Sequence, residues 1–349
     1  MSDVPAPVGR TRIWADMAVD AMGAALDRMV ENGQTPGGVI AAGSIGAGPV
    51  YAAAGATAPG GAIRPGPSTL YDVASLTKVV ATWPLVGDAV VRGLVDLDTP
   101  VSAYFSTAAP GEGGGVTVRE ILTHSSGLMP STRLDRYIGE TRDVAEAILS
   151  EPLTGSGEHR YINRGFILLG LLLARVADRP LYDLLDGFSH DLGLSGLQYG
   201  PLPRGENVAP TERRLVGGEP MHGVVHDENA HTLGGVAGHA GVFATAEALA
   251  ELAGLLLEAR DGKGGLAALS GYIDDSWSSA IRIDDVTGRG LAWLISKEGL
   301  VYHHGFTGTS LYLHPGSGRY LVVLTNAIAY GRERAGLSEL RKVAADLFA

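Results

Sequence analysis

The segments of this chain that favour β-strands lie at its two ends, far apart in the sequence. Two short β-like runs, 38–43 and 50–54, flank a turn signal that contains Gly and Pro. Near the other end, 290–296, 309–314 and 320–325 are rich in Leu, Val, Tyr and Trp, and a tight turn separates the last two. The simplest arrangement pairs these runs, so we predict that the terminal segments share one antiparallel sheet.

Helical patterns fill most of the remaining chain. Apolar residues recur at helical spacing in 16–31 and again in 336–348. Between the ends, mostly helical segments alternate with Gly-rich loops: 143–149, 161–177, 181–192 and 246–260. We therefore predict an α+β fold in which terminal helices flank the antiparallel sheet and a mainly helical region is inserted. The sheet region takes 1–84 and 289–349, the inserted region takes 85–288, and the site of this single catalytic unit lies in the cleft between them.

The composition excludes several classes of partner and chemistry. With 27 basic and 38 acidic residues the formal net charge is -11, and no cluster of Lys and Arg interrupts this acidity, so we expect neither nucleic acid nor a membrane as a partner. The longest apolar run, 165–174, is well short of the roughly 20 residues that span a bilayer. Residues 1–12 lack the apolar core of a secretion signal, so we expect a cytoplasmic protein. The absence of cysteine leaves Ser, Thr, Lys or a carboxylate for covalent chemistry.

Ser75 and Lys78 form the first candidate for catalysis. They lie in a helical run that Pro84 kinks or ends, and the three-residue offset puts both side chains on one helix face. A serine becomes an effective nucleophile when a neighbouring group takes its proton, and the Lys78 amine is within reach. Amides at the helix start favour negative charge that develops near Ser75. Because Ser-x-x-Lys is also common on helices without a catalytic role, the pair needs further support.

Two later segments offer that support. Tyr161 and Asn163 precede an apolar helix, where the phenol can act as a general base and the amide can face a cleft. The alternative is that Tyr161 packs its ring and Asn163 caps the helix. In 302–308, glycines such as Gly305 let the backbone approach a bound acyl group, and an edge strand there can supply an amide to an oxyanion. The alternative for this segment is a Gly-rich turn with two solvated histidines.

In chain order, these motifs resemble the three-motif set of class C β-lactamases and related esterases of the penicillin-recognising superfamily. The motifs are Ser75-x-x-Lys78, Tyr161-x-Asn163 and His303-x-Gly305. Segments between them also resemble the family: 95–101, 122–128 and 238–243. The resemblance thus extends along most of the chain and implies a β-lactamase/transpeptidase-like fold.

The resemblance implies a role for each matched residue. Ser75 is acylated, Lys78 and Tyr161 exchange its proton, and Asn163 holds the substrate or Lys78. The backbone amides of Ser75 and Phe306 form the oxyanion hole. The implied protein is a serine hydrolase that works through an acyl-enzyme, with neither cofactor nor metal.

One position departs from the family pattern. His303 stands where the antibiotic-hydrolysing enzymes usually have the lysine of K-T-G, and His304 replaces the threonine. A neutral histidine is a poorer anchor for a β-lactam carboxylate than an ammonium group. The expected partner is a small-molecule ester or amide, and we favour hydrolysis of small carboxylic esters. A transacylase, an amide or β-lactam hydrolase with the same site, and a non-catalytic binding module on the same fold stay open.

Other polar clusters carry weaker signals. The spacing of His222, His226 and His231, with Asp227 between them, suggests a metal site, but no metalloenzyme signature surrounds them and we favour a structural role. No serine lies in a Gly-x-Ser-x-Gly elbow between a strand and a helix. Ordering of loop backbone is the expected role of two further histidines, His124 and His239.

Overall fold

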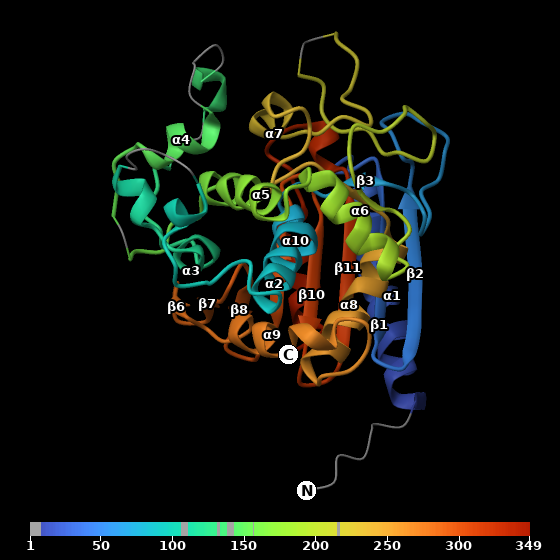
Figure 1. Cartoon of the computed structure of the whole chain (residues 1–349). Coiled ribbons are helices and arrows are strands. Elements are labelled where there is room, and N and C mark those ends of the chain that lie inside the picture. Colours follow the sequence, from blue (N-terminus) through green and yellow to red (C-terminus); the bar gives the residue numbers. More distant parts are fainter. Residues whose placement is uncertain (1–7, 106–110, 131–132, 138–142, 156, 215–216) are drawn as a thin grey trace, which may run out of the picture.

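The computed structural model describes residues 8–105, 111–130, 133–137, 143–155, 157–214 and 217–349. Its centre is an eight-stranded antiparallel sheet in the order β2-β1-β11-β10-β9-β8-β7-β6 (Figure 1). The strands are β1 (Gly37–Ser44), β2 (Ala47–Gly55), β6 (Ile281–Arg282), β7 (Thr287–Arg289), β8 (Leu294–Ser296), β9 (Val301–His304), β10 (Ser310–His314) and β11 (Arg319–Thr325). The two ends of the chain meet where β1 pairs with β11, with Gly38 opposite Thr325. This pairing confirms the predicted α+β class with a sheet shared by the terminal segments.

Both faces of the central strands are covered. Successive side chains of β1 point to opposite faces, so Ile40 lies in one apolar core and Val39 in the other. The terminal helices α1 (Val8–Glu31) and α10 (Leu337–Asp346) cover one face, and α8 (Ala246–Arg260) packs on the other against β1 and β11. Because β1 is buried on both sides, its sequence is a continuous apolar run and not an alternating one.

The middle of the chain is mainly helical. Its other helices are α2 (Trp83–Val91), α3 (Val118–Leu122), α4 (Val144–Leu149), α5 (Arg164–Ala177), α6 (Leu181–Asp191), α7 (Glu228–Thr232) and α9 (Ser270–Ser276). A second sheet, in the order β3-β5-β4, joins β3 (Tyr71–Asp72), β4 (Leu197–Tyr199) and β5 (Val242–Ala244). The four helical segments predicted here are present, whereas the small sheet was not predicted because its strands are too short to show a period. The division of the chain at residues 84 and 288 remains a prediction.

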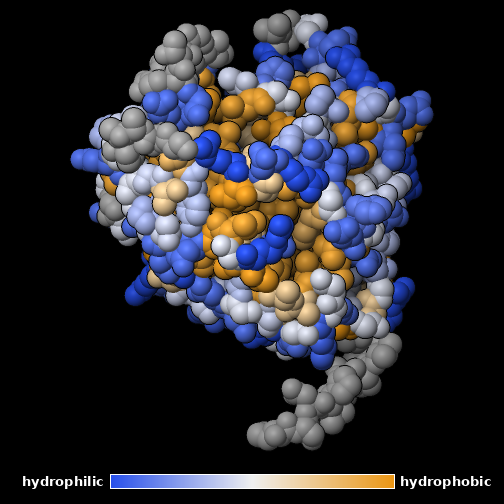
Figure 2. Space-filling view, viewed as in Figure 1, coloured by the Kyte–Doolittle hydropathy of each residue, from blue (hydrophilic) through white to orange (hydrophobic). Residues whose placement is uncertain are grey.

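Apolar side chains on one face of the molecule gather near its middle, where α2 and α5 lie, with hydrophilic side chains around them (Figure 2). Residues 164–170 of α5 are all buried, so the apolar run noted in the sequence is a helix inside the protein. In the part of the chain that the structure describes, no helix is both long and apolar enough to cross a membrane.

The strands near the C-terminus differ in two respects from the prediction. The strand expected at 290–296 is shorter, since β8 begins only at Leu294. The cause is Ala292, whose left-handed φ of 73° does not continue a β ladder. The predicted edge strand is wrong as well, since β9 lies between β10 and β8. However, β8 pairs with β9 only as far as Tyr302, so among the described strands none pairs with 303–305 on that side. The end of β9 is thus locally open.

Candidate active site

Ser75 lies on a sharp turn of the backbone that follows β3. The turn is a short 3₁₀ segment in which Ala74 has a left-handed φ of 48°. Such a φ costs a non-glycine residue about 1–3 kcal/mol, so surrounding contacts must hold it. The buried Asp72 carboxylate accepts the amide of Ala74 at 2.8 Å and the amide of His226 at 2.6 Å. The predicted first helical turn at Ser75 is therefore a strained 3₁₀ turn, held from a distant loop.

The same turn is fastened to the segment between β9 and β10. The Thr307 hydroxyl donates to the carbonyl of Asp72 at 2.7 Å, and the Thr309 hydroxyl donates to the carbonyl of Val73 at 3.0 Å. Gly305 packs against this contact, because a Cβ at 305 would lie closer than 3.0 Å to Oγ1 of Thr309 and to the carbonyl oxygen of Val73. The glycine therefore permits close packing of two protein segments, in addition to the approach to an acyl group inferred from the sequence.

Lys78 is wholly buried beside Ser75. Its Nζ has three acceptors: Oγ of Ser75 at 3.1 Å, Oδ1 of Asn163 at 3.0 Å and the backbone carbonyl of His239 at 3.3 Å. The side-chain contact expected from the three-residue offset is thus present. Pro84 does not end the helical run. A π turn, Lys78–Thr82, is followed directly by α2, and Pro84 lies in the first turn of α2.

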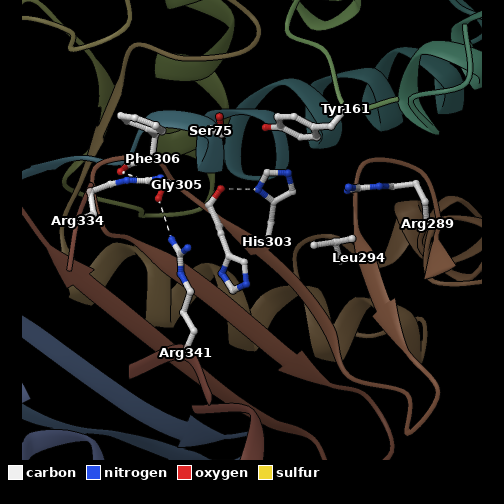
Figure 3. A pocket seen from close by; sticks show the side chains of 10 residues that line it. Ser75, Tyr161, Arg289, Leu294, His303, Gly305, Phe306, Arg334 and Arg341 are labelled. Carbon is white, nitrogen blue, oxygen red and sulfur yellow. Dashed lines mark hydrogen bonds between the residues drawn. The ribbon is translucent and has the colours of Figure 1, made fainter. Parts of the chain in front are cut away.

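Tyr161 and Asn163 lie at the start of α5. Asn163 occupies the N-cap position but makes no side-chain capping bond, since its amide oxygen accepts from Lys78. Tyr161 is 43% exposed, so its ring is not packed into the core, and the ring centroid lies 5.0 Å from Nζ of Lys78. Figure 3 shows the Tyr161 hydroxyl pointing toward Ser75. These contacts favour a site role for both residues over ring packing and helix capping.

Ser75 opens onto a cavity of about 320 Å³ (Figure 3). Its lining includes Tyr161, His303, Gly305 and Phe306, all of which are site residues expected from the sequence. Of the backbone hydrogen bonds between described residues, none uses the amide of Ser75 or that of Phe306. An amide without a backbone acceptor suits the predicted role of these two residues in an oxyanion hole.

His303 contributes a neutral imidazole to the cavity. Burial, together with the charges of Arg289 and Lys78, lowers the pKa of His303 well below its ordinary value. Its Nδ1 lies 3.0 Å from the carbonyl of His304, which assigns the proton to Nδ1 and leaves Nε2 as an acceptor. The side chain is 2% exposed, so the alternative of a solvated histidine is wrong at 303. Position 303 thus holds no cation, as expected from the sequence.

Arg289 is a cavity residue that was not predicted from the sequence. It is 3% exposed at the end of β7, and its guanidinium carbon lies 5.8 Å from the ring centroid of Tyr161. Its Nη1 donates to the carbonyl of Ala292 at 3.0 Å. Burial lowers the pKa of Arg289 to about 10, against the opposite influence of the Tyr161 and Tyr302 hydroxyls, so it is a cation at neutral pH. Arg289 lay outside the predicted strands, and a lone arginine gives no signal in the sequence that it lines the same cavity as Ser75.

Two further arginines line the cavity from the other side of β9. The Arg334 guanidinium lies 3.9 Å from the ring centroid of Phe306 and donates to the carbonyl of that residue at 3.3 Å. Arg341 of α10 donates to the carbonyl of Gly305 at 3.0 Å (Figure 3). Together with Arg289, these residues make the cavity positive although the whole chain is acidic.

His124 is buried beneath Tyr161, with ring centroids 4.5 Å apart, and its Nδ1 accepts from the amide of Ile162 at 3.4 Å. Burial first, and the neighbouring cations after it, lower the pKa of His124 well below its ordinary value. The ring therefore orders the backbone beside Tyr161, which is the role expected for it.

Two of the histidines considered as metal ligands have other partners. Nε2 of His226 lies 3.0 Å from Glu212, and Nε2 of His222 lies 3.0 Å from the carbonyl of Gly205. The carboxylate of Asp227 contacts the imidazole of a different histidine, His239. Across the described ranges, no group of three or more His, Cys, Asp and Glu side chains is arranged to hold a metal ion.

The chain is related in sequence to known proteins. The family model described as Beta-lactamase matches residues 23–346. An N-acetylmuramyl-L-alanine amidase of Bacillus subtilis (strain 168) is 28% identical over 305 residues, which cover 74% of this chain and 68% of the amidase. A putative D-alanyl-D-alanine carboxypeptidase of Escherichia coli O157:H7 is 26% identical over 305 residues, which cover 74% of this chain and 69% of that protein.

Solved structures share the fold over nearly the whole chain. A class C beta lactamase from Rhodobacter sphaeroides has a TM-score of 0.76 at 18% identity and covers 95% of this chain and 100% of its own. A penicillin-binding protein homologue from Pyrococcus abyssi, an octamer, has a TM-score of 0.72 at 20% identity, with coverages of 94% and 77%. Simvastatin synthase (LovD) from Aspergillus terreus has a TM-score of 0.68 at 19% identity, with coverages of 94% and 98%. At these identities the likeness concerns the fold, and it confirms the expected β-lactamase/transpeptidase-like architecture.

Proposed function

This chain belongs to the Beta-lactamase family, and from that premise we propose that it hydrolyses small carboxylic esters through an acyl-enzyme formed on Ser75. The observation that carries the proposal is the contact between Nζ of Lys78 and Oγ of Ser75 at the wall of the cavity. A serine hydroxyl is a weak nucleophile, so a buried amine within hydrogen-bond distance is the group that its activation requires.

The three acceptors of Lys78 suit a group that gains and loses a proton. The neutral amine has two hydrogens and one lone pair. Donation of these hydrogens to Oδ1 of Asn163 and to the carbonyl of His239 leaves the lone pair for the Ser75 hydroxyl. The protonated form has three hydrogens for the same three acceptors. Both forms are therefore accommodated without a movement of the surrounding groups.

In acylation, the Ser75 hydroxyl loses its proton and its oxygen replaces the leaving oxygen on the ester carbonyl carbon. Oγ of Ser75 bonds to the ester carbonyl carbon while its proton passes to Lys78, and the carbonyl oxygen becomes an oxyanion that accepts from the amides of Ser75 and Phe306. The bond to the leaving oxygen breaks, and that oxygen takes the proton by way of the Tyr161 hydroxyl. Water attacks the acyl group in the second half by the same route in reverse, releasing the carboxylic acid.

Two alternatives keep the fold but change the outcome. A transacylase shares the first half of the reaction and passes the acyl group to an alcohol or amine, so product analysis with added acceptors separates it from a hydrolase. A binding module forms no covalent bond. The joint presence of Ser75, Lys78 and Tyr161 around one cavity argues against a module, because a binding site needs no proton-accepting amine behind a hydroxyl.

A second candidate function is cleavage of an amide in a substrate that carries a free carboxylate. The buried Arg289 favours it, because a cation on the cavity wall that has no carboxylate among its described electrostatic partners can pair with one on a ligand. The names of two relatives, an amidase and a carboxypeptidase, point to the same substrate class. Arg289 also supplies the anion anchor that His303 lacks.

The first experiment tests the nucleophile. The intact mass of the protein is measured after exposure to a nitrophenyl alkylphosphonate, with Ser75→Ala as the matched control. We expect one adduct on the wild-type chain and none on the variant. A wild-type chain without an adduct would indicate a binding module.

The second experiment ranks substrates on one preparation. We expect kcat/KM for nitrophenyl butyrate to exceed that for a chromogenic cephalosporin, because an ester needs less anchoring and has a better leaving group than an amide nitrogen. An equal or higher cephalosporin value would identify a β-lactamase instead. A peptide amide with a free terminal carboxylate, compared with its methyl ester, tests the second candidate: preference for the free acid, lost in Arg289→Met, would support it.

A further inference from the structure

His239 supplies the third acceptor of Lys78 through its backbone, while its own side chain is wholly buried. Nε2 of the imidazole lies 2.7 Å from Oδ1 of Asp227. The same carboxylate oxygen caps α7, where it accepts the amide of Ala230 at 2.9 Å. One carboxylate therefore links α7 to the loop that contacts Lys78.

The loop around His239 is also held at the preceding residue. Gly238 lies so close to α5 that a Cβ there would collide with the carbonyl of Phe166. The carbonyl of Gly238 accepts from the Thr82 hydroxyl at 2.6 Å. The Asp227 contact adds an anchor at the residue whose carbonyl faces Lys78, so the direction of that carbonyl is set from two sides.

The pair has a defined protonation state. Burial lowers the pKa of His239, and the carboxylate of Asp227 opposes that shift without cancelling it. Burial acts to raise the pKa of Asp227, but the contacts with His239 and with the amide of Ala230 hold it well below its ordinary value. A neutral imidazole thus donates from Nε2 to an ionised carboxylate, and within the described residues its Nδ1 has no hydrogen-bond partner. Asp227 is therefore the polar group that orients the ring.

We propose that Asp227 and His239 form a positioning pair that holds the His239 carbonyl against Nζ of Lys78 and so directs the lone pair of the neutral amine at Ser75. The inference rests on the proposed function, since that function makes Lys78 a proton acceptor. Without the third contact, the amine turns about its terminal C–N bond and the lone pair leaves the Ser75 hydroxyl. Proton transfer depends on such alignment, and a misplacement of 1 Å costs about 100-fold in rate.

The test measures how fast the serine is acylated. Asp227→Ala and His239→Ala each remove the pair, and the second keeps the cap of α7. The rate constant for inactivation by a nitrophenyl alkylphosphonate, per folded molecule, should fall at least about 10-fold in both, while KM for nitrophenyl butyrate stays within about twofold. Asp227→Asn keeps an oxygen acceptor for Nε2 and should restore most of the rate. If Asp227→Ala does not fold, His239→Ala decides.

Asp143→Ala is the matched control. Asp143 caps α4 as Asp227 caps α7, since its carboxylate accepts the amide of Glu146 at 2.7 Å, but the described contacts of Lys78 do not include it. Its acylation rate should equal that of the wild type. Wild-type rates in Asp227→Ala and His239→Ala would overturn the proposal, and so would an equal loss in Asp227→Asn, since charge and not the hydrogen bond would then be responsible. No serine adduct on the wild-type chain would refute the proposed function itself.

Discussion

Replacement of Gly305 by alanine tests how closely the end of β9 must pack on the turn that carries Ser75. A Cβ at 305 would lie closer than 3.0 Å to Oγ1 of Thr309 and to the carbonyl oxygen of Val73. Thr309 cannot rotate away without cost, because its hydroxyl donates to that same carbonyl. The alanine therefore forces the two segments apart.

The size of the effect follows from these distances. Non-bonded atoms settle at about 3.5 Å, so the two segments must separate by at least about 0.5 Å. Catalytic groups tolerate displacements of about 0.5 Å, and a 1 Å misplacement costs about 100-fold in rate. We expect kcat/KM for ester hydrolysis to fall by about 10- to 100-fold. The free energy of unfolding should fall by about 1–3 kcal/mol, the usual cost of overpacking.

The assay combines steady-state hydrolysis of nitrophenyl butyrate with urea unfolding on the same preparation. Gly254→Ala is the matched control, since Gly254 lies in α8 and a Cβ there meets nothing within 4 Å. It should leave kcat/KM unchanged and raise the free energy of unfolding by up to about 1 kcal/mol. A Gly305→Ala protein with wild-type kcat/KM and an unchanged free energy of unfolding would refute the reasoning.

Three further results are expected. Ser75→Ala should abolish ester hydrolysis and leave the circular dichroism spectrum unchanged, because the contacts that hold the turn come from other residues; wild-type turnover would reject the nucleophile. Lys78→Ala and Tyr161→Phe should each lower kcat by about 100-fold or more. The double variant should lose little more, since both groups handle one proton, and additive losses would reject a shared relay. Burial lowers the pKa of His124 and of His303 in the folded protein. Each neutral imidazole therefore contributes fully to stability above the unfolded-state pKa of about 6.5. As the pH drops below that value, the free energy of unfolding should decrease by up to about 1.4 kcal/mol per pH unit for each histidine. The measurement is urea unfolding between about pH 7 and about pH 5. A free energy of unfolding that does not change over this range would contradict the prediction.

The elements that were predicted correctly are those whose surroundings stay the same along their length. The helix expected at 246–260 has buried residues from Ala246 to Ala259 and is α8 with the same bounds. The runs 38–43 and 50–54 lie within β1 and β2. The contact of Ser75 with Lys78 was also predictable, because a three-residue offset is a local property of a helical turn.

The features that escaped prediction depend on contacts between distant segments. Ala74 adopts a left-handed φ because Asp72 and a distant loop hold it there, and alanine itself carries no signal for that conformation. Arg289 faces the cavity because β7 lies beyond β8 in the sheet, an order that no local pattern reveals. The edge-strand prediction for β9 was wrong for the same reason.

The pairing of β1 with β11 also has a consequence for the order in which the protein is made. The apolar strand β1 leaves the ribosome well before its partner β11, since Gly38 pairs with Thr325. Until β11 emerges, one edge of β1 is therefore open, and exposed apolar edges favour association between chains. Thr307 and Thr309, which fasten the turn carrying the serine, are also late. We expect β1 of the nascent chain to need a chaperone until β11 emerges, and Ser75 to stay unreactive until Thr307 and Thr309 have emerged.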